Sequence, residues 1–521
     1  MNQYPLITGH RGSHAASYAR PVGWPVMLGI FLVIAVLAVF FGLVAVTANI
    51  IIVALAAGLL LGTMLLAMPI WSIWIVFFAG LMVVGVLPLW VDFLAAKSVW
   101  AVSLLGFLLF LGAIYRVLTT PGLASRTPLF LWVAFGFLAF CVVNSLAQWH
   151  SAGEFLGGFK RYFQAWGLMF ALAWTVRDGT HMDRWKKFLL IVALTQFPFA
   201  LYELLVFVPK REALAMSIPG LVPIDVVAGT FGANLYTGGA NAEMATFLII
   251  VLAYLLAQTR EKTLPRKYLA LLSLPVLAPL FMGETKVVVI LLPLMFVVLY
   301  RRELIARPHY GVVGLLIGAL LTAAAGAFYL SLSKKTLDQE IADTLAYNVY
   351  EKGYGNYALN RTSVLTFWAE EQGLRNPISF AMGNGLGSAQ TSASFVPGHI
   401  AERYPGYGIG LTAASTLLWE TGIFGSGLFL ATLWLAWRCA ARLRRIAGDP
   451  AVRGDAATIQ VALAIFGFYL FYRPSLLDTL TFQLVFAALL GYLAWLHIRI
   501  EERSMGVEAD TGDVMASGRR A

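Results

Sequence analysis

Long apolar runs recur along nearly the whole chain, and each is about as long as a bilayer is thick. A helix needs about 20 predominantly apolar residues to cross the hydrocarbon core of a membrane. The chain has 521 residues, of which 60% are hydrophobic and 12% are charged, and its mean hydropathy is +0.77. This pattern predicts an all-α polytopic integral membrane protein.

The runs correspond to about 14 transmembrane helices. They are expected at residues 24–46, 48–68, 70–89, 98–118, 128–147, 163–178, 186–207, 243–258, 267–282, 284–300, 310–331, 412–438, 457–474 and 479–499. The first run is longer than the apolar region of a signal peptide and is followed by more of the same, so a cleaved secretory signal is not expected. The expected organisation is an N-terminal segment 1–23, helices within 24–331 that include a loop at 208–242, a large loop 332–411, helices within 412–499 and a tail 500–521.

Basic residues gather in the short loops that follow alternate spans. The net charge of +10 is therefore interpreted as a topological signal, because lysine and arginine are enriched in loops that stay in the cytoplasm. Both termini are expected to be cytoplasmic, in a bacterial inner membrane. The loops 208–242 and 332–411 are then expected on the periplasmic side, and nucleic acid is not expected as a partner.

The periplasmic loop 332–411 is the longest segment outside the expected spans. An amphipathic helix is predicted from Thr336 to about Tyr350, and a second from about Thr362 to Leu374, ahead of an Asn-Pro pair that disfavours helix. Glycines at 383, 385 and 387 then predict tight turns, and Glu420 follows as an acidic residue near the start of an apolar helix.

Several lysines and arginines lie on the expected periplasmic side, although these residues are usually enriched in cytoplasmic loops. Arginine can grip phosphate through two parallel hydrogen bonds, and lysine acts as a point charge. If these residues converge, they would hold a diphosphate; the alternative is contact with lipid headgroups by snorkelling side chains. The candidate ligands are Lys160, Arg161, Arg211, Lys286, Arg361, Arg403 and Arg473.

Two residues of the loop are candidate general bases. His399 and Glu402 lie close together in sequence, and a neutral imidazole or a carboxylate can take a proton from an acceptor hydroxyl. The alternative is a solvated loop histidine with no catalytic role. No pattern typical of a metal centre, a phosphate-binding P-loop, a Rossmann turn or a Ser-His-Asp triad is found, so neither a metal nor a cofactor is expected.

Four sequence segments, in order along the chain, resemble the signature of the O-antigen polymerase and O-antigen ligase superfamily. The resemblance extends over about residues 155–430 of the chain. The segments are Ala228–Gly232 with Asn241–Ala245, then Thr285–Lys286, then Arg361–Trp368, and last Gly383–Gly387 with Ser415–Gly425.

The resemblance implies a glycosyltransferase of the C type that moves glycan from undecaprenyl diphosphate to a hydroxyl, without a nucleotide sugar or a metal. Arg361 matches the loop arginine of the family, Lys286 stands where an arginine is usual, and Arg161 lies in the earlier loop that often carries a basic residue. Ligases usually carry a histidine about nine residues before the family's glutamate. That place is Leu411 here, which favours a polymerase.

The expected function is an inner-membrane polysaccharide polymerase that joins lipid-linked oligosaccharide repeats into an O-antigen, capsule or exopolysaccharide. Its expected partners are the undecaprenyl-diphosphate-linked oligosaccharide and membrane lipids, with a chain-length regulator and a flippase as further candidates. One alternative is a ligase that transfers glycan to lipid A core or to a protein. The other is a lipid-linked sugar flippase or secondary transporter, which Glu203 within the seventh span would suit.

Overall fold

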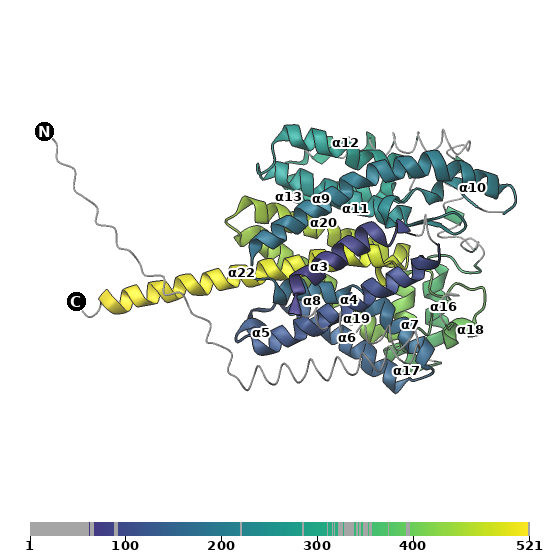
Figure 1. The fold of residues 1–521 in the computed structure, drawn as a ribbon, viewed down its shortest axis with the longest axis horizontal. Coiled ribbons are helices and arrows are strands. Elements are labelled where there is room, and N and C mark those ends of the chain that lie inside the picture. The colour runs from purple at the N-terminus through teal and green to yellow at the C-terminus, as the bar shows by residue number, and fades with distance from the viewer. Residues whose placement is uncertain are drawn as a thin grey trace, which may run out of the picture. The chain divides into compact units, whose positions relative to one another are not determined.

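The computed structural model describes most of the chain after residue 66. The described residues are 62, 67–87, 92–218, 221–283, 286–309, 357–373, 375–391 and 396–518, with isolated positions between 311 and 353. The span expected at 24–46, nearly all of that expected at 48–68, and most of the amphipathic helix expected at 336–350 lie outside them. The described residues from 67 onward belong to one compact unit and are mostly helical (Figure 1).

The helices and strands of this unit follow in chain order. They are α3 (Pro69–Phe78), η1 (Ala79–Val83), α4 (Asp92–Thr119), α5 (Leu123–Arg126), α6 (Leu129–Ala147), α7 (Ala152–Phe163), α8 (Trp166–Thr175), α9 (Gly179–Tyr202), η3 (Glu203–Phe207), α10 (Val208–Ala215), η4 (Pro223–Val226), η5 (Gly229–Phe231), β1 (Ala233–Asn234), β2 (Gly238–Gly239), α11 (Asn241–Arg260), α12 (Arg266–Met282), α13 (Val288–Ala306), α16 (Ser363–Gln372), α17 (Pro377–Met382), α18 (His399–Arg403), α19 (Ala413–Ile446), α20 (Pro450–Tyr472), α21 (Ser475–Asp478) and α22 (Leu480–Gly518). The strands β1 and β2 form an antiparallel hairpin.

Among the described residues, seven helices are long and apolar enough to cross a membrane. This confirms the expected all-α, multi-pass architecture. Other expected spans are shorter apolar helices, such as Pro69–Val83 and Trp166–Thr175. The seven candidate spans are Ser98–Thr119, Leu129–Ala147, Gly179–Ala215, Asn241–Arg260, Ala413–Ile446, Pro450–Tyr472 and Leu480–Arg503.

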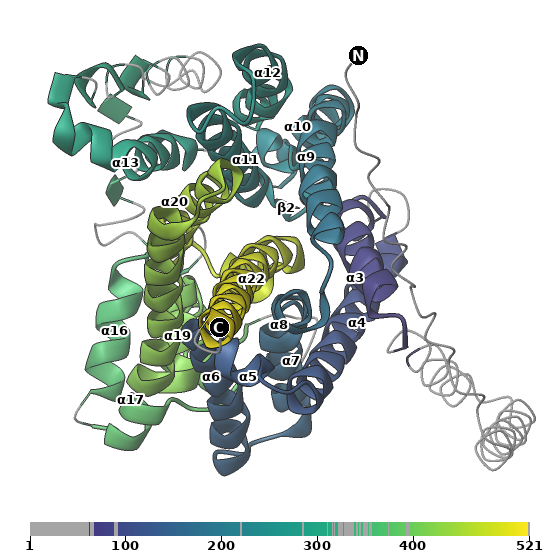
Figure 2. The same cartoon turned by 90° about the vertical axis from the view of Figure 1, so that its left-hand side faces the viewer.

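Three of these spans form the interior of the bundle. The apolar windows of α11, α20 and α22 are 83%, 78% and 78% buried, whereas that of the span containing α9 is 28% buried. Helix α22 packs against α8, and α20 packs against α19, α11 and α13. Figure 2 shows α22 surrounded by the other helices. A helix that is apolar on all sides is stable in such a central position.

The bundle has two ends that differ in chemistry. We call the end that carries α10, α16 and α18 the α18 end, and the opposite one the α5 end (Figure 1). At the α5 end, ion pairs join residues at or near the ends of separate helices to one another. These pairs are Arg126–Glu502 at 3.4 Å, Arg442–Glu501 at 3.1 Å, Arg453–Glu261 at 2.9 Å and Arg260–Glu303.

Candidate functional site

A glycine-rich turn at the α18 end organises the candidate site. Gly383, Gly385 and Gly387 have φ angles of 83°, 88° and 86°, in the left-handed region that disfavours any side chain. The predicted tight turns are therefore confirmed. The N–H of Asn384 donates to the Trp419 carbonyl at 2.9 Å, and the N–H of Gly385 donates to the Glu420 carbonyl at 3.0 Å, so the turn is fixed to α19.

Helices α6 and α7 hold the same turn from the other side. The amides of Asn144 and Gln148 donate to the carbonyls of Met382 and Gly383 at 2.8 and 2.6 Å. Gly158 lies so close to the turn that a Cβ atom there would approach the Gly387 nitrogen to 2.4 Å. These contacts bring α6, α7 and α19 together although the segments are far apart in the sequence.

Arg161, one turn further along α7, forms a buried ion pair with α19. Its Nη2 lies 2.8 Å from Oε1 of Glu420, and its Nε lies 3.3 Å from Oδ1 of Asp478 on α21. The Glu420 side chain has no exposed surface, and the Gly387 N–H faces its carboxylate. Lys160 is electrostatically coupled to Asp478. We call Arg161, Glu420 and Asp478 the buried ion cluster after its two buried members; the Asp478 side chain is 38% exposed.

A second group of charges lies where α20 ends and α11 begins. Arg473 Nη1 lies 3.3 Å from Oε2 of Glu243, and the Ser475 hydroxyl donates to the same carboxylate. The electrostatic field of Arg473 also acts on Asp225, as do those of Arg211 and Lys286. Three cations predicted from the sequence are therefore gathered around two acidic residues.

Arg361 joins this group from the loop before α16. Its Nε donates to the Tyr472 carbonyl at 2.7 Å, and its guanidinium lies 4.5 Å from the centre of the Tyr472 ring. The contact places Arg361 beside the residue that follows Tyr472 in the chain, Arg473. We call Arg211, Lys286, Arg361 and Arg473 the cation cluster.

The cation cluster has more positive than negative charge. Three of its cations act electrostatically on Asp225, and Arg473 also pairs with Glu243. Arg361 adds a fourth positive charge beside Tyr472. Burial raises the pKa of Asp225 above its ordinary value, and Arg473, Arg211 and Lys286 counteract this rise only in part. A net positive cluster formed from four separate segments can bind a polyanion, and arginine suits phosphate oxygens in particular.

The one-turn helix α21 connects the two groups of charges. Ser475 at its start contacts Glu243, and Asp478 at its end contacts Arg161. The N–H of Ala413 donates to the Arg473 carbonyl at 3.2 Å, which also ties the start of α19 to this segment. The buried ion cluster and the cation cluster are thus neighbours.

His399 is paired with a carboxylate that the sequence did not single out. Its Nδ1 lies 2.9 Å from Oε1 of Glu154, and its main-chain N–H donates to Oε2 at 3.1 Å. The imidazole of His150 stacks on that of His399, with ring centres 4.4 Å apart. If His399 donates through Nδ1, its Nε2 is left as the proton acceptor. We call His150, Glu154 and His399 the histidine cluster.

The histidine cluster also has the donor set of a divalent transition metal. Its three ligand atoms lie within 4.8 Å of one another, and two imidazoles with a carboxylate are typical zinc ligands. Within the described part of the chain, this set is the group that could hold such an ion. Sequence reasoning missed it because Glu154 and His399 are 245 positions apart.

Glu402 and Arg403 occupy exposed positions on α18. No contact among the described residues brings them into the buried ion cluster or the cation cluster. A salt bridge to Glu284 is the non-functional alternative that the sequence offers for Lys286, and Glu284 lies outside the described residues. Of the two candidate bases, the structure places His399, and not Glu402, against a buried carboxylate.

Acidic residues are the part of the site that sequence reasoning missed. Glu243 stands in the first turn of an apolar span, and Asp478 stands in a short link between two spans, so a search for acidic residues at span ends would have found both. Glu203, noted as a feature of transporters, accepts hydrogen bonds from the N–H groups of Ala228 and Gly229 at 2.8 and 2.7 Å. It therefore anchors the turn that precedes η5.

The geometry of these three clusters carries the functional argument for this chain. No model of a known protein family matches the sequence, and no curated protein matches it.

Proposed function

We propose that the chain is an inner-membrane polysaccharide polymerase of the O-antigen polymerase and ligase superfamily. It joins oligosaccharide repeats that are carried on undecaprenyl diphosphate, and the α18 end faces the periplasm. The α5 end, with its basic loops and both termini, faces the cytoplasm. The whole chain has about 14 spans, and 332–411 is its large periplasmic loop.

The observation that carries this proposal is the convergence of the cation cluster. Arg211, Lys286, Arg361 and Arg473 come from four different segments. Three of them act electrostatically on Asp225, and Arg361 contacts Tyr472, the residue before Arg473. A diphosphate group is an anion that such a cluster fits. The cluster stabilises the negative charge of the diphosphate most when the carrier departs as the leaving group.

The histidine cluster supplies a base for the acceptor. In the proposed reaction, a hydroxyl of one lipid-linked repeat attacks the anomeric carbon of another, and the bond from that carbon to the diphosphate breaks. The hydroxyl proton passes to Nε2 of His399, while Glu154 holds the opposite ring nitrogen. Attack from the face opposite the leaving group inverts the anomeric centre.

The spacing of the clusters suits a substrate of this size. Glu154 and Arg161 lie on the same helix, α7, and seven residues of helix span about 10 Å. The base therefore lies about 10 Å from the buried ion cluster, and α21 connects that cluster to the cation cluster in which the diphosphate is proposed to bind. Arg161 is already paired with Glu420 and Asp478. Its proposed role is therefore structural: it holds α7, α19 and α21 together next to the cation cluster.

Reconstitution with lipid-linked repeat units tests the proposal. The wild type is expected to form a ladder of products, and Arg361→Ala and Lys286→Ala are expected to lower the rate at least tenfold. Arg375→Ala is the matched control, because Arg375 is an arginine of the same loop whose side chain is 72% exposed and pairs with Glu371. A ladder that both cluster variants form at the wild-type rate would refute the assignment of the cation cluster.

The ligase alternative differs in its product. A ligase would transfer one finished glycan to lipid A core or to a protein and would form no ladder. Leu411, at the place of the ligase histidine, favours the polymerase. Adding both a lipid-linked repeat and lipid A core to the same vesicles separates the two functions, because the length distribution of the product identifies the acceptor.

One observation favours the transporter alternative. Lys186 on α9 forms an ion pair with Asp455 on α20 at 3.2 Å inside an apolar cavity between candidate spans, and transporters use buried ionisable pairs of this kind. A transporter would move a lipid-linked sugar across vesicles without lengthening it. Lys186→Met would then abolish translocation, whereas the polymerase proposal predicts that ladder formation depends on Lys286 and Arg361.

A further inference from the structure

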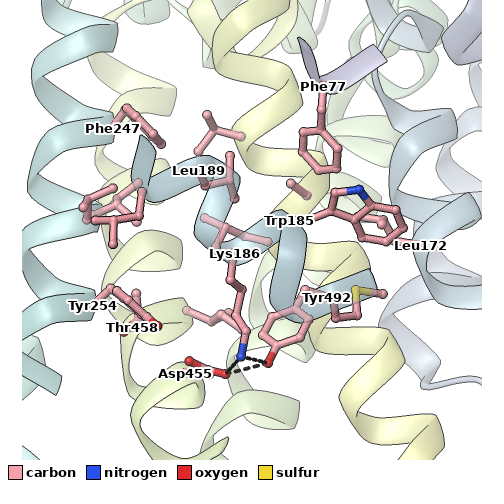
Figure 3. A pocket seen from close by; sticks show the side chains of 18 residues that line it. Phe77, Leu172, Trp185, Lys186, Leu189, Phe247, Tyr254, Asp455, Thr458 and Tyr492 are labelled. Atoms are coloured by element: carbon pink, nitrogen blue, oxygen red, sulfur yellow. Dashed lines mark hydrogen bonds and ion pairs between the residues drawn. The ribbon is translucent and has the colours of Figure 1, made fainter. Parts of the chain in front are cut away.

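An apolar cavity lies between the central helices, away from the three clusters at the α18 end. The space that protein atoms leave empty there is about 790 Å³, and this figure includes space that is open to the surroundings. Four candidate spans, which contain α9, α11, α20 and α22, contribute most of its wall, and α3 and α8 complete it (Figure 3). The cavity is therefore surrounded by the part of the protein that would lie in the hydrocarbon core.

The wall of the cavity is almost entirely apolar. Phe77, Leu172, Trp185, Leu189 and Phe247 point into it in Figure 3. On α11 the lining extends from Phe247 to Tyr254, and seven residues of helix correspond to about 10 Å. An elongated apolar space of this length fits a hydrocarbon chain better than a compact polar molecule.

Polar groups are concentrated at one end of the cavity. Lys186 extends from α9 to the Asp455 carboxylate, and the Tyr492 hydroxyl donates to the same carboxylate at 2.5 Å (Figure 3). The Gln258 amide donates to the other oxygen of Asp455 at 2.7 Å. The polar residues thus form a hydrogen-bonded floor across the cavity.

The charges of this floor are unfavourable for an anionic headgroup. Lys186 also pairs with Asp183 at 3.1 Å, so two carboxylates neutralise one ammonium group. A phosphate placed beside Lys186 would meet both carboxylates and be repelled by them. The ligand that enters the cavity is therefore uncharged in the part that the cavity surrounds.

We propose that this cavity binds a single hydrocarbon chain of a membrane lipid, with the chain end resting on the floor formed by Lys186, Asp455 and Tyr492. The chain comes either from a phospholipid acyl group or from a polyprenyl lipid, because both present the same apolar chemistry. Burial of each methylene group against the apolar wall favours the complex. The proposal does not depend on the polymerase reaction, since binding is measured without turnover.

Photolabelling of the full chain tests this proposal. The protein is reconstituted in vesicles of phosphatidylethanolamine and phosphatidylglycerol that contain either a phospholipid with a diazirine in its acyl chain or a polyprenol with a diazirine. We expect label on residues 182–190 of α9 and 485–492 of α22. The probe that gives this label identifies the source of the chain, and an excess of the unlabelled form of the same lipid should reduce it.

Cavity-filling substitutions provide the matched comparison. Val251→Phe and Ala488→Phe add bulk from two different helices, α11 and α22, and are expected to lower the cavity label at least fivefold. Leu271→Phe enlarges a side chain on α12 that is 67% exposed, and should leave the label unchanged. If a filled variant does not fold, the labelling and competition results for the wild type alone decide whether a lipid chain occupies the cavity. Label confined to exposed helix faces with both probes, or cavity label that unlabelled lipid does not compete, would overturn the proposal.

Discussion

Arg161 and Glu420 are 259 residues apart in the chain, yet they form a buried ion pair with 2.8 Å between Nη2 and Oε1. The pair joins α7 to α19 directly beneath the glycine-rich turn. Taking two charges out of water is costly, and their mutual attraction offsets that cost only in good geometry. The pair is therefore sensitive to the loss of either partner.

Arg161→Met should destabilise the protein by about 3–5 kcal/mol, because it leaves the Glu420 carboxylate buried without its cation. The double variant Arg161→Met with Glu420→Met should recover most of this loss, since no buried charge is left uncompensated; the Asp478 side chain is 38% exposed and is solvated. Thermal unfolding in detergent measures both. A double variant as unstable as the single one would contradict this account of the pair.

The raised pKa of Asp225 predicts a pH dependence of anion binding. Above its raised pKa, Asp225 is ionised and repels an anion in the cation cluster, so Asp225→Asn should then bind pyrophosphate about tenfold more tightly than the wild type. As the pH falls through the raised pKa, wild-type Asp225 also becomes neutral, and the advantage of Asp225→Asn disappears. The ratio of the two affinities should therefore approach one at low pH.

Calorimetric titration at several pH values measures this ratio, and the comparison cancels the titration of pyrophosphate itself. Glu212→Gln on α10 is a suitable control, because it removes an exposed carboxylate from the same region of the sequence. A ratio that stays constant with pH would show that Asp225 does not face the bound anion.

The Glu154–His399 pair predicts a rate effect without a binding effect. Glu154→Gln removes one of the carboxylate oxygens that hold the His399 ring and main chain in place, so kcat should fall about 100-fold while KM changes little. Glu402→Gln alters the exposed alternative base and should leave kcat close to wild type. The ladder assay under saturating substrate measures both.

The opposite result, with Glu402→Gln inactive and Glu154→Gln active, would transfer the base to Glu402.

The same ladder assay tests the metal-binding capacity of the histidine cluster. Zinc should inhibit the wild type by occupying His399, and His150→Ala should weaken that inhibition because it removes one of three ligands. Inhibition of equal strength in His150→Ala would exclude this cluster as the zinc site.

Sequence reasoning could predict the helical, membrane-spanning architecture because hydropathy acts over whole segments. It also predicted the turns at Gly383, Gly385 and Gly387, since a glycine reports on its own backbone. The pairing of His399 with Glu154 could not be predicted, because it depends on how α7 packs against the glycine-rich turn. Long-range packing brings together residues whose separation in the chain carries no signal of their contact.

The cations illustrate the same limit. Charge bias was enough to select Arg211, Lys286, Arg361 and Arg473, but it also selected Arg403, which is exposed on α18. Charge alone does not distinguish Arg403 from Arg361. The distinction appears only when Tyr472 is placed beneath the Arg361 guanidinium.

Gly387 allows the contribution of the glycine-rich turn to be measured against a matched glycine. Gly387→Ala places a residue with a side chain at φ 86°, and its Cβ would lie 2.3 Å from the Glu154 carbonyl oxygen. Gly406→Ala meets the same kind of backbone penalty at φ 77°, but no atom lies within 4 Å of its Cβ. The left-handed conformation alone costs about 1–2 kcal/mol for a residue with a Cβ atom.

Gly406→Ala should therefore lower stability by about that amount. Gly387→Ala should lose more stability and should also displace Glu154 from His399. Thermal unfolding and the ladder rate of both variants separate the two effects, and equal losses of stability and activity would show that contact between the turn and α7 does not hold the histidine cluster in place.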